Sequence, residues 1–339
     1  MWFRRRGTAN PGPAAPWRLA YDPRTTPADI LACFRLLLGR QPHEEEWRGH
    51  LTRAGEALPG VVAGYLNSLE FAARGLLRQD HMAGVTLARL PEFRIYAAAG
   101  DAAVGRYVHD DNYEREVAEV FRRLLRPGMA VLDIGANIGY FTMLSASLVG
   151  ADGYVLAIEP NPDNARLLEA SRRENGFTQV TVAQVAAAPT TGLLVLHASH
   201  SNATTSSLPA GADANAVLGA RTVPCLRPDA LVPQGRRIDL VKIDVEGAEY
   251  AALRGCTELL ARDRPVIISE FSPGMLPGIS GIGGPEYLRW LIGQSYRLSI
   301  IHLDGTLIPA TAAGGGIGGI MEVYAARAGD HIDIVATPE

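Results

Sequence analysis

The sequence predicts an α/β fold with a mostly parallel sheet, preceded by a small all-α segment, and three observations indicate it. Over residues 26–71, apolar residues recur at spacings of three and four, the period of amphipathic helices. From about residue 130, short apolar runs alternate with helical patterns, as in βαβ units. At residues 131–142, VLDIGANIGYFT combines a buried strand, a glycine turn and the start of a helix. This stretch is expected to hold a nucleotide-like ligand, because it places backbone N–H groups and a helix N-terminus beside a strand end.

The composition is that of an ordinary globular protein and excludes several classes. The 339 residues, 47% of them hydrophobic, suffice for one large domain and a smaller one. A net charge of −4 gives no reason to expect nucleic acid or an anionic membrane as partner. Cys33, Cys225 and Cys256 form no CxxC pair, which favours free thiols in a reducing compartment. Because no run approaches the roughly 20 apolar residues of a membrane helix, we expect a cytoplasmic protein without an integral membrane segment.

Four segments are expected along the chain. They are a flexible leader at 1–25, a helical accessory domain at 26–80, an α/β domain at 84–327 and a C-terminal tail at 328–339. The leader is expected because a basic start runs into a Pro/Ala/Gly-rich stretch that is too polar and broken for a signal peptide.

The helical segment carries clear start and stop signals. Thr26 and Asp29 resemble a capping box, and Gly39 is expected to end the first helix. Two further helices are expected at 44–54 and 58–71. Because no catalytic set of side chains occurs here, we expect a scaffold or a docking site for a protein partner.

The α/β segment is expected to begin with one or two β-hairpins within 75–112 and an amphipathic helix at 113–125. After the opening motif, strands are expected at 154–158, 180–187, 193–197, 221–225, 238–243 and 266–269, with helices at 162–174, 248–261 and 285–292. A closing hairpin of strands at 296–302 and 319–326 is expected to supply the antiparallel strand of a seven-stranded sheet.

The glycine turn differs from a dinucleotide fingerprint. That fingerprint needs glycine at 135, 137 and 140, where this chain has Gly135, Asn137 and Tyr140. The D-x-G-x-x-x-G form of Asp133, Gly135 and Gly139 is instead the one that S-adenosylmethionine-dependent methyltransferases of the Rossmann-like class carry. The glycines let the backbone approach the methionine and ribose portions, and Asp133 can accept from the methionine ammonium.

A second acid supports a nucleoside-like ligand. Glu159 ends the next strand, about 20 residues after the glycine turn, where such folds hydrogen-bond both ribose hydroxyls. Pro160 and Asn161 break that strand. We expect Glu159, Pro160 and Asn161 to contact the cofactor together with Ala136 and Asn137 of the turn.

A third motif makes the resemblance to a known family specific. In DLVKIDVEGAE, residues 239–249, a strand ending at Asp244 leads through a glycine into a helix. Together with the helix that begins at Tyr113-Glu114, the VLDIGANIGYFT turn, the IEP after the second strand and the later PVIISEF, residues 84–327 resemble FkbM-type methyltransferases. After the third strand the chain departs from many such enzymes, which carry an acidic or polar residue there to hold adenine, whereas this chain reads AQVAAAPTT. The contact to adenine is therefore expected to be made by the backbone alone.

This resemblance implies a Rossmann-like class I methyltransferase fold with S-adenosylmethionine as cofactor, and it adds Glu114 and Asp244 to the expected cofactor contacts. It also implies O-methylation of a hydroxyl on a saccharide, glycan or related natural product. LLGRQPHEEEW and YLNSLEF resemble a bacterial helical domain that is attached to glycosyltransferases and methyltransferases of surface-polysaccharide synthesis. An oligomer is compatible with the sequence.

Methyl transfer to an alcohol is aided by a base that removes the hydroxyl proton. Asp244 and Glu270 end neighbouring strands and are the first candidates, since two close acids raise one pKa. His302, near the end of a late strand, is the third. Glu246 and Glu249 are expected to favour the positive end of the following helix. No ligand spacing demands a metal.

Two alternatives remain open at this point. One is an NAD(P)-dependent oxidoreductase, which the missing glycines at 137 and 140 oppose. The other is a non-catalytic scaffold on a degenerate methyltransferase fold, which the intact motif set opposes. The stretches 198–220 and 271–284 are expected to form the acceptor-binding walls.

Overall fold

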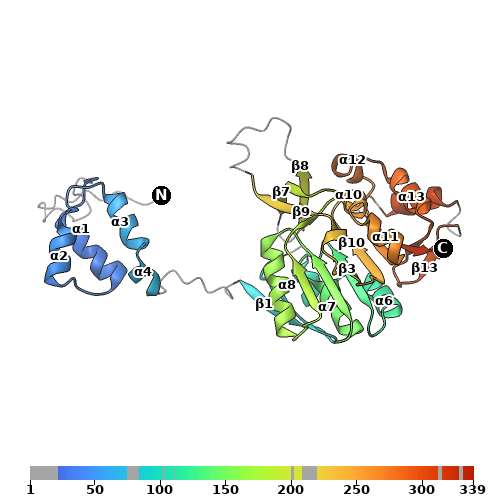
Figure 1. Cartoon of the computed structure of the whole chain (residues 1–339), viewed down its shortest axis with the longest axis horizontal. Coiled ribbons are helices and arrows are strands. Elements are labelled where there is room, and N and C mark those ends of the chain that lie inside the picture. The colour runs from blue at the N-terminus through green and yellow to red at the C-terminus, as the bar shows by residue number, and fades with distance from the viewer. Residues whose placement is uncertain are drawn as a thin grey trace, which may run out of the picture. The chain divides into compact units, whose positions relative to one another are not determined.

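The computed structural model describes residues 22–74, 84–101, 104–110, 112–199, 202–207, 220–311, 315–327 and 331–339. The chain separates into two compact units, Met1–Ala83 and Gly84–Glu339 (Figure 1). Most of the expected leader at 1–25 lies outside the described residues. Within the part that the structure describes, no helix is long and apolar enough to cross a membrane.

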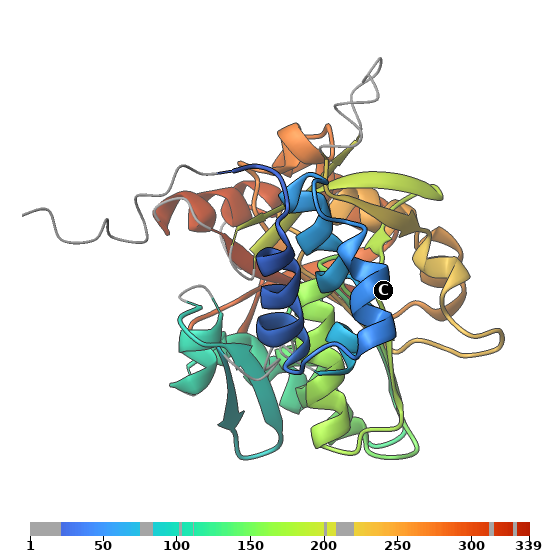
Figure 2. The same cartoon turned by 90° about the vertical axis from the view of Figure 1, so that its left-hand side faces the viewer.

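The N-terminal unit is helical, as predicted (Figure 2). Its elements are α1 (Pro27–Cys33), which continues as the π-helix η2 (Phe34–Leu38), then α2 (Glu44–Leu51), α3 (Leu58–Leu66) and α4 (Leu69–Ala73). The capping box of Thr26 and Asp29 is present, and Gly39 ends the first helix in a left-handed conformation. Phe34 and Tyr65 are buried in a small core of their own, so this unit has a hydrophobic centre independent of the sheet.

The second unit begins with an antiparallel hairpin, β1 (Val85–Arg89) and β2 (Arg94–Ala98), which confirms that prediction. The helix α6 (Arg115–Leu124) follows as expected, whereas the short helix α5 (Gly105–His109) was not predicted. The hairpin lies against the helix α8 (Pro162–Glu174), because backbone N–H groups of Arg94 and Tyr96 donate to side chains of Asn175 and Ser171.

The main sheet has eight strands among the described residues, in the order β13-β12-β14-β11-β10-β3-β4-β5. Their bounds are β3 (Ala130–Ile134), β4 (Tyr154–Ile158), β5 (Val180–Ala183), β10 (Leu240–Ile243), β11 (Val266–Phe271), β12 (Tyr296–Ile301), β13 (Leu307–Pro309) and β14 (Ile332–Pro338). Strands β5, β4, β3, β10 and β11 are parallel, and β14 runs antiparallel between β11 and β12. The predicted seven-stranded, mostly parallel sheet is thus present, with β13 as an additional short edge strand.

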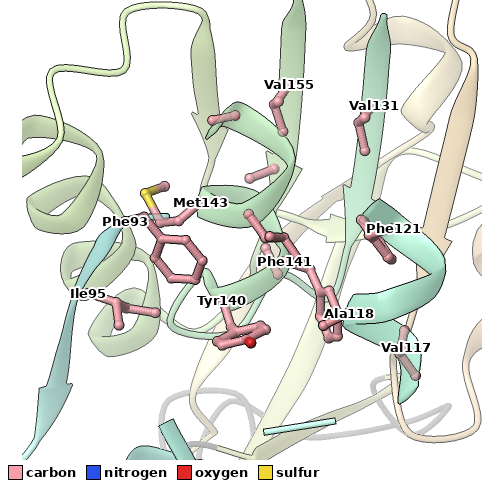
Figure 3. Close-up of a cluster of buried hydrophobic side chains, with 14 of the residues drawn as sticks. Phe93, Ile95, Val117, Ala118, Phe121, Val131, Tyr140, Phe141, Met143 and Val155 are labelled. Atoms are coloured by element: carbon pink, nitrogen blue, oxygen red, sulfur yellow. The ribbon is translucent and has the colours of Figure 1, made fainter. Parts of the chain in front are cut away.

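Alternating residues of the central strands enter two separate cores, because successive side chains of a strand point to opposite faces. On one face Val131 and Val155 pack with Phe121 of α6 and Phe141 of α7, as Figure 3 shows. Leu132 and its equivalents face the other core. The helices are α6, α7 (Tyr140–Val149) and α8 on the first face, and α10 (Glu249–Arg254), α11 (Thr257–Asp263), α13 (Gly284–Gly293) and α14 (Ile317–Ala326) on the second.

A small second sheet has the order β6-β9-β7-β8. It consists of β6 (Ala186–Ala187), β7 (Gly192–Ser199), β8 (Asn202–Ser207) and β9 (Thr222–Leu226). β7 and β9, whose strands were predicted at 193–197 and 221–225, pair antiparallel. The stretch 198–220 is not loop throughout, because β8 pairs antiparallel with β7; residues 208–219 lie outside the described part of the chain.

The C-terminal prediction was wrong in two respects. Residues 319–326 lie in the helix α14 and not in a strand. Residues 328–339 are not a tail, because Ile332–Pro338 forms β14 with five consecutive buried residues. The physical reason is hydrogen bonding between strands. β11 and β12 each have an edge of backbone groups that need partners, and β14 lies between them and pairs with both.

Candidate active site

A large cavity lies where β3, β4, β10 and β11 end. Its volume is about 1470 Å³, beyond the roughly 300–1,000 Å³ of a typical small-molecule site. It lies at the carboxyl ends of parallel strands, where open α/β sheets bind ligands. The predicted site residues that line it are Glu114, Gly135, Asn137, Glu159, Pro160, Asp244 and Glu270.

The glycine turn is fixed by close packing. Gly135 has φ +80°, and a Cβ added to it would lie 1.8 Å from the carbonyl oxygen of Asp244. Gly139 has φ +98° and packs its backbone against Leu168 of α8. Asn137 adopts φ 51°, which an asparagine tolerates better than most residues. The turn therefore brings the ends of β3 and β10 into backbone contact, so that one ligand can meet both.

Asp133 is buried behind this turn and does not line the cavity. Its Oδ2 accepts from the Thr142 hydroxyl at 2.5 Å, and its Oδ1 has no hydrogen-bond partner among the described residues. Burial raises the pKa of Asp133. A buried carboxylate oxygen without a donor is costly, so this side chain retains an unused acceptor.

Glu159 lines the cavity and is held by backbone donors. Its two carboxylate oxygens accept from the N–H groups of Asn137 and Asn161, each at 2.8 Å. Burial raises the pKa of Glu159 to about 7. Asn161 caps α8 through Asp163 N–H and does not line the cavity, nor does Ala136. The two asparagines thus orient Glu159, whose oxygens keep further acceptor positions.

Asp244 and Glu270 form a hydrogen-bonded carboxyl pair, as predicted from their strand ends. Lys242 Nζ lies 2.9 Å from Asp244 Oδ2, so the two share a face of β10. Burial would raise the pKa of Asp244, but Lys242 and the hydrogen bond from Glu270 outweigh it and hold that pKa below its usual value. Burial and the charge of Asp244 raise the pKa of Glu270 well above its usual range. Near neutral pH the pair therefore consists of an ionised Asp244 and a protonated Glu270, whose Oε1 also accepts from Ser272.

Glu114 reaches the same cavity from the start of α6. Its backbone is left-handed, with φ 38°, a strained conformation for a glutamate that is typical of functional positions. Burial raises the pKa of Glu114 to about 8, although Lys242 lowers it. Tyr113, which hydrogen-bonds Glu114, also lines the cavity.

Glu249 plays a structural part. Its side chain is fully buried, and Oε1 accepts from the N–H groups of Val245 and Gly247, each at 3.1 Å. Burial raises the pKa of Glu249 to about 7. Glu249 thus closes the turn that follows Asp244, whereas Glu246 lines the cavity.

The third predicted catalytic residue is not brought to the site. His302 lies in the turn after β12, with 51% of its side chain exposed, and pairs with Asp304 at 3.2 Å. It does not line the cavity, although Leu303 and Asp304 beside it do. The prediction failed because the strand ends one residue earlier and the turn directs the ring outward to Asp304.

Two further residues near the carboxyl pair were not predicted. Asp333 of β14 stands opposite Glu270 in the strand register, and burial raises its pKa to about 6. His331 lines the cavity just before β14. The alternation in HIDIVATP was the available signal, but it belongs to a strand that starts at the site and does not end there. Among the described residues, no group of three or more His, Cys, Asp or Glu side chains is arranged to hold a metal ion.

Known proteins resemble the second unit. Residues 133–298 match the model of the methyltransferase FkbM domain. A stretch of 43 residues is 49% identical to ribosomal RNA large subunit methyltransferase E of Sorangium cellulosum, covering 13% of this chain and 20% of that protein.

Two solved structures are also similar to this chain. Methyltransferase FkbM from Methylobacillus flagellatus has 14% identity and a TM-score of 0.39, over 65% of this chain and 50% of that one. An S-adenosylmethionine-dependent O-methyltransferase from Thermotoga maritima has 14% identity and a TM-score of 0.37, over 67% and 66% of the two chains. This chain thus spans about half the length of the first and a fifth of the ribosomal RNA methyltransferase.

The matched residues include the glycine turn, Glu159, the Asp244–Glu270 pair and the strands β4, β5, β10 and β11. The fold is the class I methyltransferase fold that the sequence led us to expect. Residues 133–298 therefore form a domain of the FkbM-type family of S-adenosylmethionine-dependent methyltransferases.

Proposed function

We propose that this protein transfers a methyl group from S-adenosylmethionine to a hydroxyl of a saccharide, glycan or related natural product. The observation that carries the proposal is one cavity with two chemically distinct sides. One side has the glycine turn and Glu159, which suit a nucleoside; the other has the Asp244–Glu270 carboxyl pair, which suits proton removal.

The residues present fit this cofactor. Asp133 Oδ1 is a buried acceptor without a donor among the described residues, as expected for a site that receives an ammonium, directly or through water. Glu159 is oriented to accept from ribose hydroxyls, and the small side chains of Ala186 and Ala187 line the cavity where only backbone contacts to adenine were expected. Glu114 adds a carboxyl group for a cationic ligand. When bound, S-adenosylmethionine supplies a methyl group activated by its sulfonium.

The two carboxyl groups of the pair have different roles in the proposed proton transfer. Ionised Asp244 is suited to accept the proton of the acceptor hydroxyl, and protonated Glu270 holds it in place. Lys242 keeps Asp244 ionised and fixes its orientation from a buried position. A pair whose two pKa values are driven apart is a common sign of acid–base work.

A saccharide acceptor is proposed from the family resemblance and from the resemblance of the helical unit to domains of polysaccharide-synthesis enzymes. We also propose that the helical unit, residues 26–80, docks a protein partner. Neither the acceptor nor the partner is needed for the first test of function.

Calorimetric titration of the full chain with S-adenosylmethionine tests the cofactor, and NAD serves as the competing ligand. Binding of S-adenosylmethionine but not NAD is expected. No binding of S-adenosylmethionine would contradict the proposal and leave a scaffold role, and binding of NAD alone would indicate an oxidoreductase. Transfer of labelled methyl to a panel of glycans then tests the reaction.

A further inference from the structure

The cavity extends beyond the catalytic groups to a surface that the reaction centre does not use. This surface is formed by α5, the first turn of α6 and the turn between β12 and β13. The last two are in close contact, because a Cβ on Gly305 would lie 3.2 Å from the carbonyl oxygen of Glu116 in the first turn of α6. The surface is therefore closely packed where α6 meets the turn between β12 and β13.

Two apolar side chains on this surface are poorly covered. Tyr107 of α5 is 47% exposed and Leu303 is 69% exposed, and both line the cavity. An aromatic ring beside a cavity offers a flat apolar face to a ligand while its hydroxyl keeps a hydrogen bond. The C–H face of a sugar ring is a suitable partner for such a face.

Polar side chains beside Tyr107 also lack partners. Asn112, Arg115 and Glu116 line the cavity, and none makes a side-chain hydrogen bond or ion pair with the residues that the structure describes. Together they offer amide, guanidinium and carboxylate groups from the start of α6 and the bend before it. Such planar groups pair with neighbouring hydroxyls, each of which donates and accepts.

The charge of the cavity limits what can bind. Among its described lining residues, eight carry carboxyl groups and three are arginines. The carboxyl groups are those of Glu114, Glu116, Glu119, Glu159, Asp244, Glu246, Glu270 and Asp304. Without Glu114, Glu159 and Glu270, whose pKa values are raised, five remain. Arg122 and Arg123 are also paired, with Glu92 and Glu119. This balance repels phosphates and polyanions such as RNA, which need a basic surface.

We propose that Tyr107, Leu303, Asn112, Arg115 and Glu116 form a subsite for the second sugar ring of an uncharged oligosaccharide acceptor. The inference rests on the proposed function, because it assumes that a sugar hydroxyl is methylated beside Asp244. The methylated ring lies at the carboxyl pair, and the adjoining ring stacks on Tyr107. The volume of about 1470 Å³ accommodates both rings together with a cofactor.

The test uses the full chain with S-adenosylhomocysteine bound and saturation-transfer NMR of ligands. The probes are uncharged oligosaccharides of one to four rings in several linkages, the matching sugar phosphates and homopolymeric RNA. An uncharged ligand of two or more rings is expected to bind best. Tyr107→Ala should weaken its binding about 10-fold or more, the loss of one buried aromatic contact, whereas Tyr107→Phe keeps the ring and should bind normally.

Calorimetry with S-adenosylmethionine accompanies each variant. If wild-type protein does not bind S-adenosylmethionine, the proposed function fails. If it does, the subsite is overturned when single sugars bind as tightly as longer ones, or when Tyr107→Ala binds the oligosaccharide like wild type. It is also overturned when sugar phosphates or RNA bind in preference to uncharged oligosaccharides, or when no uncharged oligosaccharide binds. A normal melting temperature and cofactor affinity of Tyr107→Ala show that a loss is not due to unfolding.

Discussion

Gly135→Ala tests whether the cofactor turn and the catalytic strand are held together by backbone contact. Gly135 has φ +80°, and the carbonyl oxygen of Asp244 lies 1.8 Å from the position that a Cβ would take. A backbone carbonyl at the end of a buried strand cannot rotate away as a side chain can. The methyl group must therefore push β3 and β10 apart.

The magnitude follows from two terms. A left-handed conformation costs an alanine about 1–2 kcal/mol relative to glycine. An overpacked methyl group in a tight interior costs about 1–3 kcal/mol more. Gly135→Ala should therefore lower the free energy of unfolding by about 2–5 kcal/mol, and weaken S-adenosylmethionine binding at the same time because the displaced turn itself lines the cofactor side of the cavity.

Gly176→Ala is the matched control. Gly176 has φ +68°, ends α8 and has nothing within 4 Å of its would-be Cβ, so this change carries only the conformational term. Urea unfolding measures both variants in a chain whose Trp2, Trp17 and Trp47 are changed to Phe, so that the fluorescence of Trp290 reports on the second unit alone. Equal destabilisation by the two changes, or normal cofactor affinity in Gly135→Ala, would refute the reasoning.

Three further predictions concern the carboxyl groups. Asp244→Asn and Glu270→Gln should each lower turnover by about 100-fold or more, which is the usual contribution of a general base. Calorimetry should show that both variants retain their affinity for S-adenosylmethionine. Unchanged turnover in both variants would remove the pair from the reaction. Burial raises the pKa of Glu159 to about 7 in the folded protein, so the folded state retains a proton that the unfolded chain releases near pH 4.5. The free energy of unfolding should therefore fall by about 3 kcal/mol as the pH rises between these two values. Parallel pH profiles of stability for wild type and Glu159→Gln would contradict this. Glu249→Ala removes the acceptor of two backbone N–H groups after Asp244 and should destabilise the protein by about 1–3 kcal/mol. Thermal unfolding measures this loss against the isosteric Glu249→Gln, which keeps an acceptor oxygen and should lose less stability.

The sequence was sufficient for the parallel half of the sheet. Four of the five strands there, β5 being the exception, are apolar runs that end at or beside an acid or a glycine, and parallel strands bring their carboxyl ends to one edge. That rule alone placed Glu159, Asp244 and Glu270 at one edge of the sheet from the sequence.

The antiparallel half did not follow from the same rule. β14 brings its amino end to the site, so Asp333 and His331 precede their strand and carry no strand-end signal. The helix α14 has two glycines near its start and mixed apolar residues, and only its packing against the second core distinguishes it from a strand. The left-handed backbone of Glu114 depends on tertiary contacts of α6 and has no local signature.

The position of β14 has a consequence for how the chain assembles. β11 and β12 are not neighbours in the sheet, so their edges stay open until residues 332–338 insert between them. A nascent or truncated chain that ends before residue 332 would present two unpaired apolar strand edges, a template for intermolecular pairing. Because the inserted strand pairs residues as distant as Ile267 and Ala336, its docking is expected to be a slow, late step of folding. The carboxyl pair acquires its neighbour Asp333 only in that step.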